Sequence, residues 1–138
     1  MTDILKSQTV LVASTANVSG QTIQVSNCQS LTLTVTASVD AATLVAALRL
    51  TGTNDDASAL DPSSILPTLN TGEIITVAPT EITYTAATGV LAYASPEVGT
   101  HEVTLAFTRF PKWVRPVFDY DSGGGAVDVR VVIGSWSV

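Results

Sequence analysis

The sequence predicts an all-β fold: a single antiparallel β-sandwich, jelly-roll-like, with about nine or ten short strands. Two observations predict it. Apolar and polar residues alternate with a period of two along most of the chain, as they do in half-buried antiparallel strands. These runs are short, and clusters of Gly, Pro, Asn and Asp separate them at the spacing typical of sandwiches and barrels.

The first forty residues contain three predicted strands, at 8–14, 21–27 and 30–39. Alternation is clearest in the third strand, where aliphatic residues face one side and threonines face the other. The aliphatic side consists of Leu31, Leu33 and Val35, and the threonine side of Thr32, Thr34 and Thr36. A strand with one threonine-rich face is expected to lie with that face toward solvent.

Residues 40–56 fit two structures. Asp40 could cap a helix and the alanines favour one, whereas the alternation from Leu44 to Leu50 fits a strand. We favour the strand, because its neighbours are strands and the sequence at 52–55, Gly-Thr-Asn-Asp, is typical of a turn.

A long loop is expected around residues 53–72, with room for one helical turn at 63–69. Short strands follow at 73–78, 81–86 and 89–94, and a longer one at 99–110. The segment 109–132 is expected to form the last hairpin, with Val114, Phe118 and Tyr120 facing the core and a glycine-rich turn.

The chain of 138 residues is expected to form one domain, 1–138, because no linker, repeat or low-complexity tract interrupts it. Residues 1–12 are expected to be an arm or an edge strand that pairs with a neighbouring molecule. The N-terminus has no signal-peptide pattern and no apolar run reaches membrane-spanning length, so we expect synthesis in the cytoplasm and no membrane partner.

The net charge of −6 argues against nucleic acid as a partner, because an acidic surface repels phosphates. The segment 109–132 holds four of the six basic residues, Arg109, Lys112, Arg115 and Arg130. Three aspartates lie among them and leave the segment a net charge of only +1 (four minus three). We therefore expect Arg115 and Arg130 to pair with these aspartates across strands rather than to bind phosphate.

No catalytic chemistry is predicted. The chain has one histidine, His101, but no nucleophile-elbow motif that would present a serine to it. It has one cysteine, Cys28, so no disulfide can form within the chain. One His and one Cys cannot form a zinc site, and no cofactor is predicted. Asp55, Asp56 and Asp61 are candidate calcium ligands within one loop, although turn-forming aspartates explain the same pattern.

Four residues are candidates for a protein–protein interface: Lys112, Trp113, Arg115 and Trp136. Tryptophan and arginine are the side chains most enriched at the energetic centres of such interfaces. Trp113 could equally cover the end of the sandwich without contacting a partner. Only 13% of the residues are charged, about half the usual share, which suits surfaces that become buried between subunits.

Two turn patterns carry a resemblance to a known group of proteins. They are Gly52-Thr53-Asn54-Asp55 at a strand end, and Phe110-Pro111 with Arg115 before a strand, a glycine-rich turn and a valine-rich strand at 127–132. Their order resembles the small β-sandwich virion proteins of tailed bacteriophages. Asp56 stands where that group usually has a glycine, and a long insertion follows it.

The resemblance implies a structural protein of the virion that decorates and stabilises the capsid, or a related head-fibre or tail component. It implies a major capsid protein or another virion protein as partner, a homo-oligomer with a trimer favoured, and a place on the capsid surface. A carbohydrate-binding module for host attachment, with or without calcium, is the alternative. The two differ in whether the aromatic side chains are exposed as a sugar platform or are buried.

Overall fold

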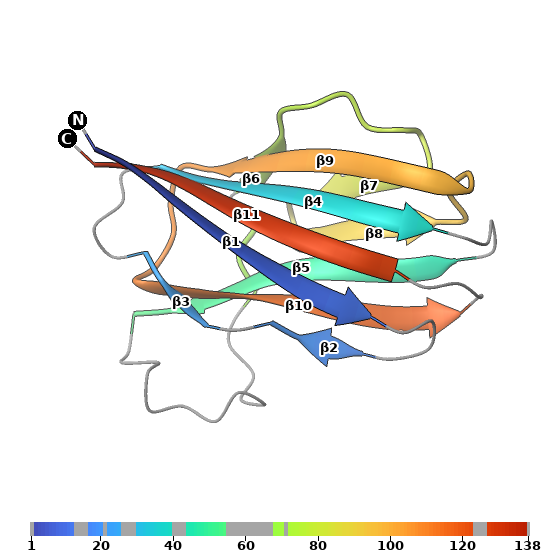
Figure 1. Cartoon of the computed structure of the whole chain (residues 1–138), viewed down its shortest axis with the longest axis horizontal. Helices are drawn as coiled ribbons and strands as arrows, with labels where there is room; N and C mark the ends of the chain where they lie inside the picture. Colours follow the sequence, from blue (N-terminus) through green and yellow to red (C-terminus); the bar gives the residue numbers. More distant parts are fainter. Residues whose placement is uncertain are drawn as a thin grey trace.

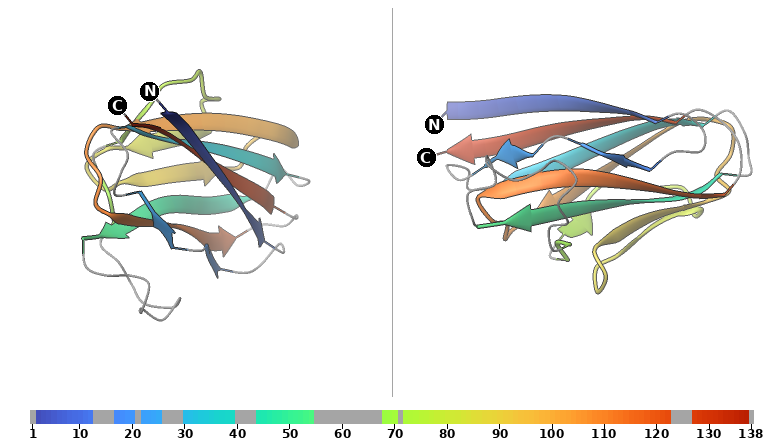
Figure 2. Two further views of the ribbon diagram at one scale, coloured as in Figure 1. Left: turned by 60° about the vertical axis from the view of Figure 1, so that its left-hand side comes forward. Right: turned by 90° about the horizontal axis from the view of Figure 1, so that it is seen from below.

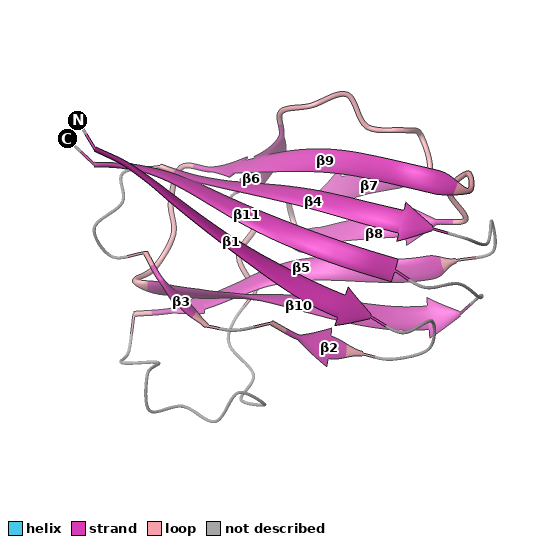
Figure 3. Ribbon diagram, viewed as in Figure 1, coloured by secondary structure: helices cyan, strands magenta, loops and turns pink. Residues whose placement is uncertain are grey.

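The computed structural model of the chain describes residues 2–12, 17–20, 22–25, 30–39, 44–54, 68–70, 72–122 and 127–137. In this part the chain forms eleven strands and no helix (Figure 3). All strand pairs are antiparallel, and the strands form two sheets that lie face to face (Figures 1 and 2). The predicted all-β sandwich is therefore confirmed.

The first sheet has the strand order β1-β11-β4-β9-β6 (Figure 1). Its members are β1 (Thr2–Val12), β11 (Val127–Ser137), β4 (Leu31–Val39), β9 (Gly99–Phe107) and β6 (Gly72–Ile74). The second sheet has the order β2-β10-β5-β8-β7, and β3 also pairs with β10. Its members are β2 (Val18–Ser19), β3 (Ile23–Gln24), β10 (Trp113–Ser122), β5 (Val45–Thr53), β8 (Val90–Ala94) and β7 (Ile82–Thr85).

The connections follow a jelly roll. With β3, β6 and β7 set aside, eight strands remain, and numbered in chain order they form sheets 1-8-3-6 and 2-7-4-5. This is the strand order of a double Greek-key jelly roll. Both sheets keep open edges and do not close into a barrel.

The core forms between the two sheets from the inward side of each alternating strand. In β4 the buried residues are Leu31, Leu33, Val35 and Ala37, which are fully inaccessible, as the alternation predicts. From the second sheet come Leu48 and Leu50 of β5 and Val114 and Phe118 of β10, with Tyr120 packed against them. These aliphatic and aromatic side chains supply most of the stabilisation, at roughly 25 cal/mol per Å² of apolar surface buried.

The ambiguous segment 40–56 contains a strand. β5 runs from Val45 to Thr53 and pairs with β10 on one side and β8 on the other. A central strand with partners on both sides leaves few backbone groups unpaired, and this tertiary pairing outweighs the helix preference of the alanines.

The prediction of a hairpin at 109–132 is wrong. β10 lies in the second sheet, whereas β11 lies in the first, between β1 and β4. The chain crosses from one sheet to the other between Ser122 and Val127. Alternation reports which face of a strand is buried but not which sheet the strand joins, and a glycine-rich link suits a hairpin and a crossing alike.

The N-terminal segment forms an edge strand. β1 pairs along its whole length with β11 of the same chain, from Thr2 opposite Ser137 to Val12 opposite Val127. The chain ends therefore lie side by side (Figure 1). On its other side, β1 has no strand partner in the part of the chain that the structure describes.

Candidate interaction site

The two turn patterns of the sequence lie against each other at one end of the sandwich. The amide N–H of Lys112 donates a hydrogen bond to Oδ1 of Asn54 at 3.2 Å. Gly52 lies directly under the ring of Pro111, because a Cβ added to Gly52 would stand 2.4 Å from Pro111 Cγ and 2.8 Å from the Trp113 carbonyl oxygen. Two motifs that are 58 residues apart in sequence thus form one structural unit, and glycine is the residue that fits at position 52.

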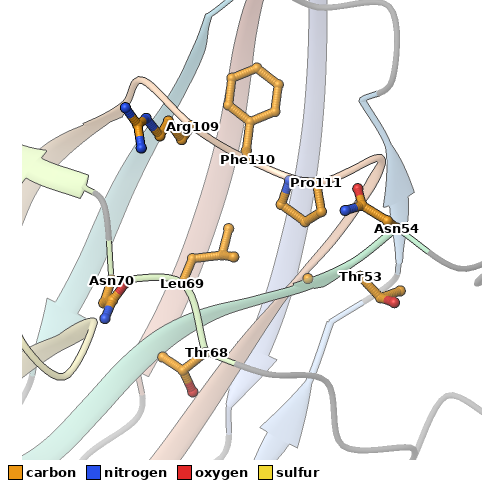
Figure 4. A pocket seen from close by; sticks show the side chains of 9 residues that line it. Thr53, Asn54, Thr68, Leu69, Asn70, Arg109, Phe110 and Pro111 are labelled. Atoms are coloured by element: carbon orange, nitrogen blue, oxygen red, sulfur yellow. The ribbon is translucent and has the colours of Figure 1, made fainter.

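A hollow of about 500 Å³ opens beside this unit (Figure 4). Its apolar wall consists of Leu69, Phe110 and Pro111, and its polar rim includes Asn54, Asn70 and Arg109. Figure 4 shows Leu69 pointing from its segment toward Phe110 and Pro111. The volume lies within the range of protein ligand pockets, roughly 300–1,000 Å³.

Backbone contacts fix the segment 68–70, which lines one side of the hollow. The N–H of Leu69 donates to the carbonyl oxygen of Leu50 at 2.7 Å, and Thr68 forms an isolated β-bridge with Thr51. The segment 68–70 is therefore held against β5, so this side of the hollow is ordered.

The four predicted interface residues lie on or directly beside strands of two different sheets. Lys112 is exposed and Trp113 is partly buried at the start of β10, next to the hollow. Arg115 is buried, with 2% of its surface exposed, and its carbonyl oxygen accepts a hydrogen bond from Thr51 Oγ1 at 2.9 Å. Trp136 lies in β11 of the other sheet, opposite Asp3. Burial removes Arg115 from the candidate interface, whereas Lys112 and Trp113 stay candidates, and the side chain of Trp136 lies outside the described residues.

Asp119 of β10 forms an ion pair with a different arginine from the two that the sequence predicted. Asp119 is joined to Arg49 of β5, which lies diagonally across the outer face of the second sheet. The predicted partners were Arg115 and Arg130, of which Arg115 is buried and the side chain of Arg130 lies outside the described residues. Both members of the Arg49–Asp119 pair are more than one third exposed, so the pair contributes little stability.

The candidate calcium ligands Asp55, Asp56 and Asp61 lie outside the described residues. Within the described ranges, no group of three or more His, Cys, Asp or Glu side chains could hold a metal ion.

His101 lies in β9, and its Nε2 is 2.5 Å from the carbonyl oxygen of Glu97, so the ring is held against its own turn. In the same part of the chain, no helix is long and apolar enough to cross a membrane.

A second surface stands out on the opposite edge of the first sheet. The large hydrophobic side chains exposed in the described part are Ile75, Val77 and Val98. Ile75 and Val77 lie in the connection from β6 to β7, which arches beside β9, and Val98 directly precedes β9 (Figure 1). Exposed apolar side chains gathered along one edge indicate a contact surface.

Sequence reasoning missed the hollow and this apolar edge. Leu69 gives no separate signal, because the same loop also contains Leu60, Ile65 and Leu66. Asn70 and Arg109 carry no signal of their own, since only the fold brings the ends of β5 and β9 together. The exposure of Val77 could not be predicted either, because an alternating pattern assigns valines to the core.

The comparisons with known proteins identify no relative: no family model, no curated protein and no solved structure matches this chain.

Proposed function

We propose that this protein is a structural protein of a tailed-phage virion, which decorates and stabilises the capsid by binding the capsid lattice and copies of itself. It is made in the host cytoplasm and acts on the capsid surface without a cofactor or a catalytic step. The observation that carries the proposal is the edge strand β1, which has eleven residues and a partner on one side only within the described chain.

A long open edge presents a row of unpaired N–H and C=O groups that another strand can join. Natural sandwiches usually protect such edges with short strands, bulges, prolines or lysines. The other edge of this sheet, β6, has three residues, whereas β1 has eleven and contains a single lysine, Lys6. We infer that β1 pairs with a strand of the capsid lattice.

Surface composition supports the same proposal. Charged residues make up 13% of the chain, and the described surface exposes Ile75, Val77 and Val98. Interfaces between protein subunits are depleted in charged residues at their centres. The jelly roll is used by viral capsid proteins but also by lectins, so the fold is compatible with the proposal and does not decide it.

The hollow favours one alternative, a carbohydrate-binding module for host attachment. Amide and guanidinium groups beside an aromatic ring are suited to hydrogen-bonding sugar hydroxyls and packing against a sugar ring. Asn54, Asn70, Arg109 and Phe110 supply these groups.

Size-exclusion chromatography with light scattering, with and without a chelator, separates the two functions. The structural role predicts an oligomer whose mass and melting temperature do not change on chelation. A monomer that loses stability with chelator and binds on a glycan array would contradict the structural role and support the alternative.

A further inference from the structure

We propose that copies of this chain join head to tail, with the apolar loop 75–77 of one copy seated in the hollow of the next. The inference rests on the proposed function and deepens it, because it names the contact through which the copies would join. The occupant of the hollow is a second copy of this chain.

The loop 75–77 has the form of a fixed apolar projection. Val77 is 97% exposed and Ile75 is 53% exposed. The loop is held on β9 by two hydrogen bonds of 3.0 Å, from the Ile75 N–H to the Thr104 carbonyl oxygen and from the Thr104 N–H to Thr76 Oγ1. An apolar projection that is already ordered loses little entropy on docking.

The hollow offers matching chemistry just beyond the end of β9, at Arg109, Phe110 and Pro111. Its wall of Leu69, Phe110 and Pro111 is apolar and can receive an aliphatic side chain (Figure 4). Arg109 and Lys112 are exposed cationic side chains, and they lie at this hollow or directly beside it.

Among the residues that the structure describes, the exposed charges favour one orientation. All four glutamates of the chain lie between residues 73 and 102, and no Lys or Arg occurs from 50 to 108. Glu73 and Glu102 are exposed on the strands that carry the loop, β6 and β9. A symmetric contact of loop against loop would oppose glutamates, whereas a contact of loop against hollow brings them to Arg109 and Lys112.

A contact between two different patches leaves one free loop and one free hollow on every pair of copies. Such heterologous contacts continue until a ring closes or a filament grows. The protein is therefore expected to form a closed ring or a filament rather than a two-fold dimer.

The test uses two variants that disable opposite halves of the contact. Val77→Asp places a charge on the loop, and Arg109→Glu reverses the charge of the hollow; both positions are exposed, so the fold is expected to survive. Each variant alone should raise the dissociation constant for self-association roughly tenfold or more, measured by light scattering over a concentration series. The matched control is Ala87→Asp, which places the same acidic side chain at an exposed position in the turn between β7 and β8, outside both the loop and the hollow, and should leave association unchanged.

Mixing the two variants gives the decisive result. An equimolar mixture should form a complex of two chains, because the intact loop of the Arg109→Glu chain fits the intact hollow of the Val77→Asp chain. A mixture that stays monomeric, a wild type that is monomeric at all concentrations, or an equal effect of Ala87→Asp would each overturn the inference.

Sedimentation with capsids separates this inference from the proposed function. If wild-type protein pellets with capsids but mixing rescues nothing, the function stands and the inference is wrong. If the mixing result holds while wild-type protein does not pellet with capsids, the contact is real and the proposed function is wrong.

Discussion

At the scale of the residue, Gly52 connects the two turn motifs. A Cβ at this position would meet the Pro111 ring and the backbone oxygen of Trp113, and the backbone oxygen cannot move without disturbing β10. Pattern reasoning recognised the glycine as a turn residue, but its close contact with a proline 59 positions away (111 minus 52) could not be predicted, since alternation does not report packing between strand ends.

Substitution of Gly52 by Ala is expected to lower the free energy of unfolding by about 1–3 kcal/mol, the usual cost of overpacking. Chemical denaturation measures this change. Thr83→Ala, at an exposed position of β7, is the control and should change stability by less than about 0.5 kcal/mol. Equal stability of Gly52→Ala and wild type would show that the Pro111 contact is not close.

Tyr93 is a buried residue whose hydroxyl has no hydrogen-bond partner in the described part of the chain. Burial raises the pKa of Tyr93 above its ordinary value of 10.0, because the phenolate would lose its hydration. The folded state therefore keeps this proton when the unfolded state has released it. Stability is fully present below about pH 10 and falls as the pH rises above that value.

Tyr93→Phe is expected to leave stability at pH 7 unchanged or to raise it by up to about 1–3 kcal/mol, since no protein hydrogen bond is lost and an unpaired buried hydroxyl is removed. Above pH 10 the variant should lose stability less steeply than wild type. Thermal melts from pH 7 to pH 11 test both statements, and parallel curves for the two proteins would contradict the second.

At the scale of the element, strand type could be predicted and strand partners could not. Alternation correctly assigned β4, β5 and β9, because buried apolar residues recur at every second position in each. β10 and β11 were expected to pair, although each satisfies its backbone in a different sheet. The hollow at the ends of β5 and β9 depends on which strands pair in each sheet. The sequence pattern does not report this, so the hollow could not be predicted.

Two neighbouring prolines in β1 test the role of the open edge. In an antiparallel edge strand the N–H groups point alternately toward the partner strand and away from it. Of Ser7→Pro and Gln8→Pro, one therefore removes a hydrogen bond to β11 and the other removes an outward donor.

The variant that loses the bond to β11 should melt at a clearly lower temperature than wild type. The other should melt close to wild type but bind capsids more weakly. Circular dichroism identifies which variant is which, and unchanged capsid binding by the stable variant would show that β1 is not a docking strand.

At the scale of the whole molecule, the jelly roll leaves two candidate contact surfaces on one small domain. The edge strand β1 lies at one border of the first sheet, and the apolar loop 75–77 follows β6 at the other (Figures 1 and 2). A protein with contact surfaces at both borders of a sheet can bind a lattice with one and its own copies with the other. The low charge and the absence of a predicted catalytic constellation agree with this division.

The most direct test of the structural role is sedimentation of the purified protein with capsids of the phage that carries this sequence. We predict that the protein pellets with capsids and saturates at a fixed number of copies per capsid. Protein that remains in the supernatant at every ratio, while the capsids pellet, would contradict the account.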